Sequence, residues 1–228
     1  MRIEPRPRSV VEVGRSLAGF REWHALRTYF LAQVDWMQSR RRQRSTQFDH
    51  SVPWWSYGCT TFLDQVVSTD ARILELGAGG STLWWLERGN RVTSIEGSSE
   101  WAKEVAGKAA TYKDRLDLVG MDADDHEAIR RLLEGQSFDV LVIDHSGDRP
   151  AAVRFLRDLV APIGMLILDN SDRAEYAAVL DDLRTSGFQL LDFAGLGPIN
   201  AFAGTTTLAV RSGITIAGRR PALVTVAN

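Results

Sequence analysis

Short apolar runs and amphipathic segments alternate along most of this chain. Runs of strand character lie at 72–75, 91–95, 116–120, 138–143, 164–168, 188–193 and 205–211. Segments with apolar residues at helical spacing lie before and between them, at about 60–67, from 81 onward, and at about 99–112, 124–134, 150–159 and 174–185. This alternation predicts a doubly wound, Rossmann-like α/β fold with a mostly parallel, seven-stranded sheet. The last two strands follow each other without a helix, which predicts one antiparallel edge strand.

A helical extension is predicted before this domain, because apolar residues recur at helical spacing from Ser16 to Arg42. The extension and a partly apolar C-terminal end could support a homodimer. We therefore expect three parts: an N-terminal arm with helices (1–55), an α/β domain (56–211) and a C-terminal tail (212–228).

Composition narrows the class of protein without identifying a function. The chain has 228 residues, of which 44% are hydrophobic and 25% charged, as in an ordinary soluble domain. A net charge of −2 argues against bulk binding to nucleic acid. The single cysteine, Cys59, rules out an internal disulfide framework and a cysteine zinc cluster. No apolar run reaches the roughly 20 residues of a membrane span, and no signal-peptide pattern is evident. We expect a cytoplasmic protein.

The segment 73–82, Ile-Leu-Glu-Leu-Gly-Ala-Gly-Gly-Ser-Thr, predicts a strand, a tight turn and a helix start. Glycines let the backbone approach a ligand closely, and the free N–H groups of a helix N-terminus attract polar or anionic groups. The turn does not fit the dinucleotide fingerprint, because Thr82 stands where its third glycine should be. A hydride-transferring dehydrogenase is therefore disfavoured. A plain glycine-rich surface turn is the structural alternative.

The letters E-L-G-A-G-G-S-T resemble the first motif of class I S-adenosylmethionine (SAM) dependent methyltransferases. An acidic residue, Glu96, follows the next predicted strand, where a carboxylate can accept both ribose hydroxyls of an adenosine. The resemblance implies SAM as cofactor. The residues that it assigns to cofactor binding are Glu75, Gly77, Ala78, Gly79, Ser81, Glu96, Gly97, Asp122 and Asp144.

Polar residues also follow the fourth and fifth predicted strands of the domain. Asp144 ends one, and Asp169 and Asn170 end the other. Parallel strands end at the same edge of a sheet, so these side chains can converge beside the glycine turn. Two carboxylates and an amide oxygen suit Mg²⁺ or a similar hard cation. The alternative is that each caps a loop or helix, a common use of Asp and Asn.

The patterns I-D-H-x-x-D-R and L-x-D-N resemble the metal site of catechol-type O-methyltransferases, and the resemblance covers about 56–211. It implies Asp144, Asp169 and Asn170 as ligands of Mg²⁺. One departure is clear, because Gly147 stands where those enzymes carry a lysine base. His145 is the first candidate for that role, since histidine titrates near neutral pH, with Asp144 as its catalytic neighbour. Asp148 and Asp172 are lesser candidates, and His145 could instead only support the cofactor.

The predicted function is a SAM- and Mg²⁺-dependent O-methyltransferase that acts on a small hydroxylated acceptor, without nucleic acid or membrane as partner. A saccharide is favoured because a vicinal diol could chelate the metal. The tryptophans at 54, 55, 84 and 85 could stack on a sugar, although core packing explains such aromatics equally well. A weaker resemblance to bacterial sugar O-methyltransferases, of the mycobacterial methylmannose polysaccharide type, points the same way.

Three other functions stay open. A phenolic or polyketide acceptor is the close alternative to a saccharide. An N-methyltransferase or nucleic-acid methyltransferase could use the arginine run 40–44, although the N-P-P-[YF] type of motif is absent after the fourth strand. A protein that binds SAM without turnover is the third possibility.

Overall fold

A computed structural model describes residues 37, 51–198 and 203–211. The predicted N-terminal helices, the arginine run 40–44 and the tail 212–228 lie outside the described residues, as does most of the proposed arm. The three-part division of the chain and the homodimer therefore stay predictions.

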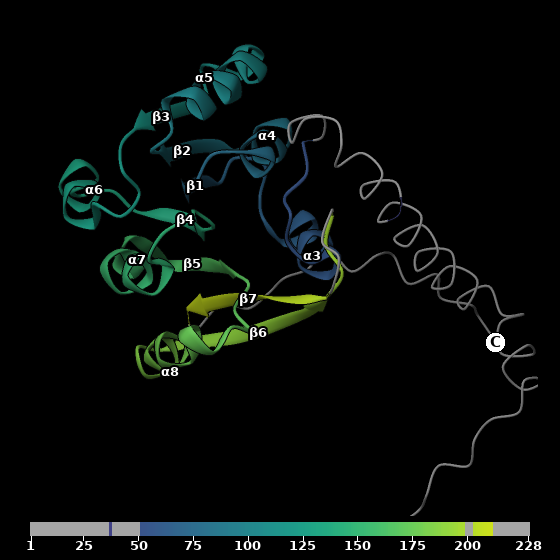
Figure 1. The fold of residues 1–228 in the computed structure, drawn as a ribbon, viewed down its shortest axis with the longest axis vertical. Coiled ribbons are helices and arrows are strands. Elements are labelled where there is room, and N and C mark those ends of the chain that lie inside the picture. Colours follow the sequence, from purple (N-terminus) through teal and green to yellow (C-terminus); the bar gives the residue numbers. More distant parts are fainter. Residues whose placement is uncertain (1–36, 38–50, 199–202, 212–228) are drawn as a thin grey trace, which may run out of the picture.

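Seven strands form one mixed sheet in the order β3-β2-β1-β4-β5-β7-β6, and this confirms the predicted doubly wound fold (Figure 1). Each predicted strand is present, with small differences at its ends. The strands are β1 (Arg72–Leu76), β2 (Arg91–Glu96), β3 (Leu116–Gly120), β4 (Phe138–Ile143), β5 (Val160–Asp169), β6 (Phe188–Gly195) and β7 (Gly204–Arg211).

The antiparallel strand is β7, and it does not form the edge of the sheet as predicted. It pairs antiparallel with β5 on one side and with β6 on the other, so that β6 is the edge strand. The last helix carries the chain from β5 to β6 and leaves the position between these two strands open. The chain turns back after β6, and β7 fills this position. Local sequence patterns do not reveal this pairing.

The described part of the chain has six α-helices, of which the first precedes β1 and the other five connect successive strands. They are α3 (Tyr57–Val66), α4 (Gly80–Glu87), α5 (Ser99–Lys108), α6 (His126–Leu132), α7 (Arg149–Leu156) and α8 (Ala177–Thr185). Three helices that the sequence predicted as continuous are an α-helix joined to a short 3₁₀ turn, at 110–112, 157–159 and 174–176.

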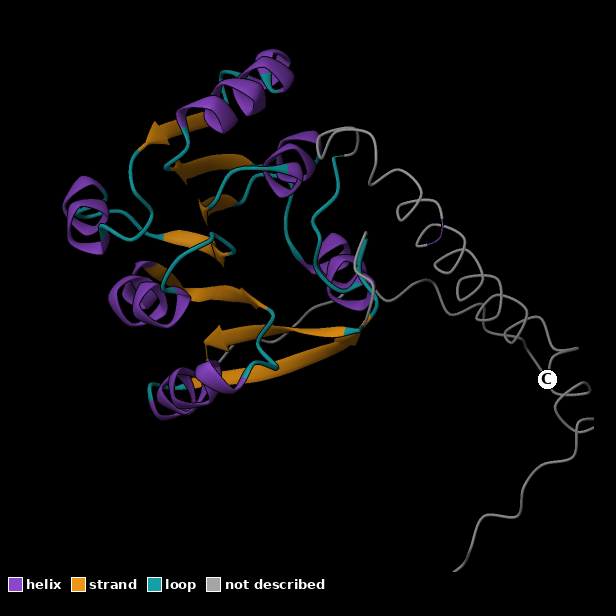
Figure 2. Ribbon diagram, viewed as in Figure 1, coloured by secondary structure: helices purple, strands orange, loops and turns teal. Residues whose placement is uncertain are grey.

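Helices cover both faces of the sheet (Figure 2). α6, α7 and α8 lie on one face, and α3 and α4 lie on the other, while α5 packs on β2 and β3. In β5, for example, Leu166 and Leu168 join the core under the first group of helices, and Ile167 joins the core under the second. Because both faces are buried, the central strands are apolar at nearly every position.

Side chains at the carboxyl edge of the sheet fix the starts of three helices. Ser98 accepts the Trp101 N–H at the start of α5, and Asp148 accepts the Ala151 N–H at the start of α7. Asp125 does the same for α6. Among the described residues, no helix is long and apolar enough to cross a membrane.

Candidate active site

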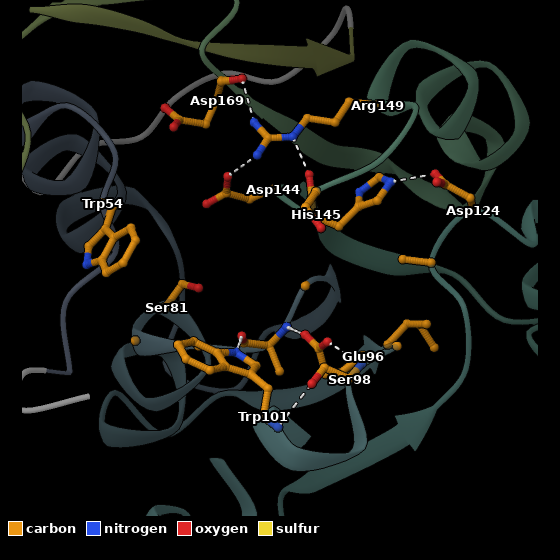
Figure 3. Close-up of a pocket in the computed structure, with 18 of the residues that line it drawn as sticks. Trp54, Ser81, Glu96, Ser98, Trp101, Asp124, Asp144, His145, Arg149 and Asp169 are labelled. Carbon is orange, nitrogen blue, oxygen red and sulfur yellow. Dashed lines mark hydrogen bonds and ion pairs between the residues drawn. The ribbon is translucent and has the colours of Figure 1, made fainter. Parts of the chain in front are cut away.

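A cavity of about 680 Å³ lies at the carboxyl edge of the sheet, where the predicted site residues gather (Figure 3). This volume is within the usual range of small-molecule sites. The cavity is lined by the turn after β1, the ends of β2 and β3, α5, the loops after β4 and β5, and the segment before α3. The predicted residues that line it are Gly77, Ala78, Gly79, Ser81, Glu96, Gly97, Asp122, Asp144, His145, Asp169 and Asn170.

The glycine turn is shaped by a close approach between two loops. Gly77 has a φ of 92°, and a Cβ there would lie 3.0 Å from the Cα of His145. α4 starts one residue earlier than Ser81 and Thr82 indicated, with Gly79 at its N-cap. The Gly79 N–H donates to the Thr82 hydroxyl at 2.8 Å, so Thr82 closes the turn from within the helix.

Glu75 does not line the cavity, which corrects its prediction as a cofactor contact. Its side chain is fully buried on the face of the sheet covered by α4, where its carboxylate accepts hydrogen bonds from Ser81, Thr82 and Ser94. Burial raises the pKa of Glu75 to about 7, although the three hydroxyl donors act in the opposite direction. Glu75 therefore anchors the turn from below.

Glu96 faces the cavity and at the same time holds its floor. One carboxylate oxygen accepts the Ala78 N–H at 3.1 Å, and the other accepts the Ser98 N–H at 2.7 Å. Trp101 of α5 lies beside it and donates its indole N–H to the Ala78 carbonyl. Trp101 was not predicted from the sequence, where it is one aromatic residue of an ordinary amphipathic helix.

Asp124 joins the loops after β3 and β4. Its Oδ1 accepts the Asp148 N–H at 2.8 Å and lies 3.1 Å from Nε2 of His145. Gly147 makes this approach possible, because a Cβ at 147 would lie 2.3 Å from that same oxygen. The small residue at 147 thus leaves room for an aspartate from the neighbouring loop.

His145 is not placed to act as the predicted base. Its Nε2 is held by Asp124, and its Nδ1 is buried without a hydrogen-bond partner. Burial lowers the pKa of His145, which keeps the ring neutral at pH 7. The geometry agrees better with the supporting role that the sequence left open. Asp148 caps α7 and Asp172 accepts the Thr205 N–H, and neither of these alternative bases lines the cavity.

Asp124, His126 and His145 also bring three possible metal-ligand atoms within 4.8 Å of one another. The Nε2 of His126 lies 3.8 Å from Oδ1 of Asp124, beyond hydrogen-bonding distance. That oxygen is already shared by His145 and the Asp148 N–H. The contact between the loops after β3 and β4 therefore explains why Asp124 and His145 lie close together.

The guanidinium of Arg149 lies between the ends of β4 and β5 (Figure 3). Its Nη2 contacts Oδ1 of Asp144 at 2.9 Å, and its Nη1 donates to the Asp169 carbonyl at 3.1 Å and to Oδ1 of Asn170 at 3.2 Å. Its Nε donates to the His145 carbonyl at 2.6 Å. Only 12% of the Arg149 side chain and 22% of the Asp144 side chain are exposed, so this ion pair is largely shielded from water.

These contacts test whether the three predicted ligands fit Mg²⁺. Asp144 is bound by Arg149 and also accepts the Trp55 indole N–H at 3.1 Å. Oδ1 of Asp169 accepts the Thr206 hydroxyl at 2.7 Å, and Oδ1 of Asn170 faces Arg149. Donors and a fixed positive charge compete with an ion for these oxygens. In this arrangement the residues fit Mg²⁺ poorly, and the metal site stays a prediction.

Burial raises the pKa of Asp144, with the nearby Asp169 carboxylate adding to the effect and Arg149 opposing it. Burial likewise raises the pKa of Asp169, against the lowering effect of its hydrogen bonds and of Arg149. Two carboxylates and one guanidinium leave this cluster with a charge of −1 when both acids are ionised.

The two tryptophans before α3 have different roles. Trp55 is fully buried against Trp84 and Trp85, as in the core-packing interpretation, and its indole fixes Asp144. Trp54 lines the cavity together with Val52, as in the alternative interpretation. Trp84 and Trp85 belong to the core and do not reach the cavity.

Comparisons with solved structures place this fold among enzymes that bind SAM. An O-methyltransferase from Bacillus cereus, solved in complex with SAH, has a TM-score of 0.58 at 20% identity and covers 77% of this chain and 88% of its own. The O-methyltransferase TomG from Streptomyces achromogenes, solved with SAM, has a TM-score of 0.55 at 20% identity over 68% and 77%. The fold is that of class I SAM-dependent methyltransferases.

A putative O-methyltransferase from Klebsiella pneumoniae has a TM-score of 0.58 at 19% identity, and it covers 84% of this chain and 99% of its own. One curated relative, the 23S rRNA (uracil(1939)-C(5))-methyltransferase RlmD of Halomonas elongata, is 27% identical over 161 residues. This covers 69% of the chain, which spans about a third (32%) of that relative's length. No family model matches the chain.

The buried carboxylate of Glu75 predicts a pH dependence of stability. Its folded pKa of about 7 lies above the ordinary value of 4.5, so the folded state binds more protons between these values. The free energy of unfolding should therefore fall as pH rises through this window, at up to about 1.4 kcal/mol per pH unit. Glu75→Gln cannot titrate, so urea unfolding of both proteins between pH 5 and pH 7.5 should give curves that diverge by about this slope. If the stability of both proteins changed with pH in the same way, Glu75 would not have the raised pKa assigned to it.

Proposed function

We propose that this protein is a SAM-dependent O-methyltransferase for a small acceptor. One observation supports it best: the buried carboxylates at the ends of β4 and β5 line the same cavity as the glycine turn and Glu96. One end of the cavity thus has the features of a nucleoside-type site, and the other has groups that can accept a proton. SAM supplies a methyl group already activated on a sulfonium, so the protein has to align an oxygen and take up its proton.

The residues around the glycine turn fit such a cofactor. The turn leaves space beside Gly79, where an added Cβ would meet nothing within 4 Å. Glu96, Asp122 and Ala123 line the cavity. We assign Glu96 to the ribose hydroxyls and the other two to the adenine side. Gly77, Ala78, Ser81 and Gly97 line the remaining wall, and Asp144 faces the same space. We assign these residues, with Trp101, to cofactor binding.

Asp144 is the base that the geometry favours, as one of the two catalytic residues expected from the sequence. Its carboxylate faces the cavity and is fixed by Arg149 on one oxygen and Trp55 on the other. A raised pKa brings a carboxylate closer to the pH of the reaction, and this makes it a better base than a solvent-exposed one. The neighbouring Asp169 can share the proton.

The poor fit to a metal changes which acceptor is favoured. A divalent ion would acidify a bound alcohol, but here the acceptor has to be deprotonated by a carboxylate. A phenol has a pKa of about 10, as in tyrosine. The pKa of a sugar hydroxyl is closer to that of water, which is about 15.7. A phenolic or otherwise acidic hydroxyl therefore suits this site better than the saccharide expected from a chelated diol. Trp54 gives such a ring an aromatic wall.

The cofactor assignment predicts a loss of affinity in Glu96→Gln. Removing a charged acceptor of ribose hydroxyls should weaken S-adenosylhomocysteine binding by about 1.5–3 kcal/mol, or roughly 10–100-fold. Calorimetric titration measures this change directly. Glu100→Gln is the matched control, because Glu100 lies nearby in the first turn of α5 and does not line the cavity. Equal affinities of the two variants would remove Glu96 from the cofactor site.

The base assignment predicts that Asp144→Asn lowers methyl transfer by about 10²–10⁴-fold and leaves S-adenosylhomocysteine affinity largely intact. The assay follows labelled methyl from SAM into a panel of phenols, saccharides and ribosomal RNA, once with Mg²⁺ and once with EDTA. Asp172→Asn serves as control, since Asp172 does not line the cavity.

We expect phenols to be the methylated class and EDTA to have no effect. Transfer to saccharides that requires Mg²⁺ would restore the diol-chelating function. Labelled RNA would favour the chemistry of the curated relative, and tight cofactor binding without transfer to any class would favour a non-catalytic protein.

A further inference from the structure

We propose that Arg149 is the resident cation of this site: its guanidinium takes the place predicted for a divalent ion and positions Asp144 for proton uptake. The catalytic role of Arg149 rests on the proposed methyl transfer, but its test requires no acceptor. Arg149 is a positioning residue, because it acts through Asp144.

The donor geometry of Arg149 matches the oxygens that a metal would otherwise hold. Four contacts of its guanidinium reach Asp144, the Asp169 carbonyl, the Asn170 side chain and the His145 carbonyl, at 2.6–3.2 Å. These oxygens lie at the ends of the neighbouring strands β4 and β5. One planar group with several fixed donors thus ties both loops together, as a multidentate cation would.

The position of Arg149 in its helix is not explained by the helix itself. Arg149 is the first residue of α7, after the N-cap Asp148. The N-terminus of a helix favours negative charge and disfavours a cation. An arginine that is nearly buried at this position therefore needs a strong local reason, and the carboxylate of Asp144 at 2.9 Å supplies it.

A divalent ion held by Asp144 and Asn170 would compete with this guanidinium. The guanidinium already contacts Oδ1 of both residues, and like charges repel strongly in a site shielded from water. Unlike an ion, the guanidinium cannot dissociate or be removed by a chelator. The orientation of Asp144 is therefore built into the chain and does not depend on the supply of metal.

The test is the binding of Mn²⁺ alone, followed by electron paramagnetic resonance as loss of the free-ion signal. The protein is the full chain saturated with S-adenosylhomocysteine. The wild type should bind no Mn²⁺ at millimolar concentrations. Arg149→Met frees the oxygens and removes the charge, so it should bind Mn²⁺ at least tenfold more tightly than the wild type. Arg149→Lys keeps the charge and should stay metal-free.

Two results would overturn the proposal. The first is stoichiometric Mn²⁺ binding by the wild type that Asp169→Asn abolishes, which would establish the predicted metal site. The second is a folded Arg149→Met variant, with normal circular dichroism and S-adenosylhomocysteine affinity, that gains no Mn²⁺ binding. Arg149→Gln repeats the test if the methionine variant fails to fold. Because no acceptor is involved, these results are independent of whether the protein methylates an oxygen.

Discussion

The ion pair between Arg149 and Asp144 is the contact on which the functional end of this fold depends. The segments after β4 and β5 together bring carboxylate, amide and carbonyl oxygens to the edge of an apolar sheet. Oxygens gathered in this way repel one another unless a cation or a set of donors lies between them. Arg149 provides both, because one guanidinium carries the charge and also several donors in fixed directions.

A buried carboxylate on the neighbouring strand β1 is stabilised in a different way. Glu75 lies in the middle of the sheet with no cation near it, and three hydroxyl groups surround its carboxylate. Ser81 and Thr82 come from the first turn of α4, so the buried acid fixes the helix that follows the glycine turn. At the cavity, the Arg149 guanidinium offsets the charge of Asp144. Below the cavity, neutral hydroxyl groups hold the Glu75 carboxylate, and burial raises its pKa.

The sequence was sufficient for the elements and for the edge at which the polar residues gather. Glu75 was predicted as the last residue of its strand, but β1 continues to Leu76, so its side chain points into a face and not toward the edge. The role of Arg149 could not be assigned from the sequence either. Arg149 is part of the predicted motif. Its partners, however, lie on two segments that are far apart in the sequence and that come together only when the sheet forms. The place of β7 inside the sheet depends in the same way on non-local pairing.

A cation that belongs to the chain limits the chemistry that the site can perform. Two carboxylates and one guanidinium leave a single negative charge beside the space proposed for a sulfonium. A reaction between an oxygen anion and a sulfonium cancels charge, so a buried site of low dielectric does not oppose it. The difficult step is the formation of that anion. A buried carboxylate of raised pKa can form it from an acidic hydroxyl but not readily from a sugar, so the residue that competes with the metal also limits the acceptor.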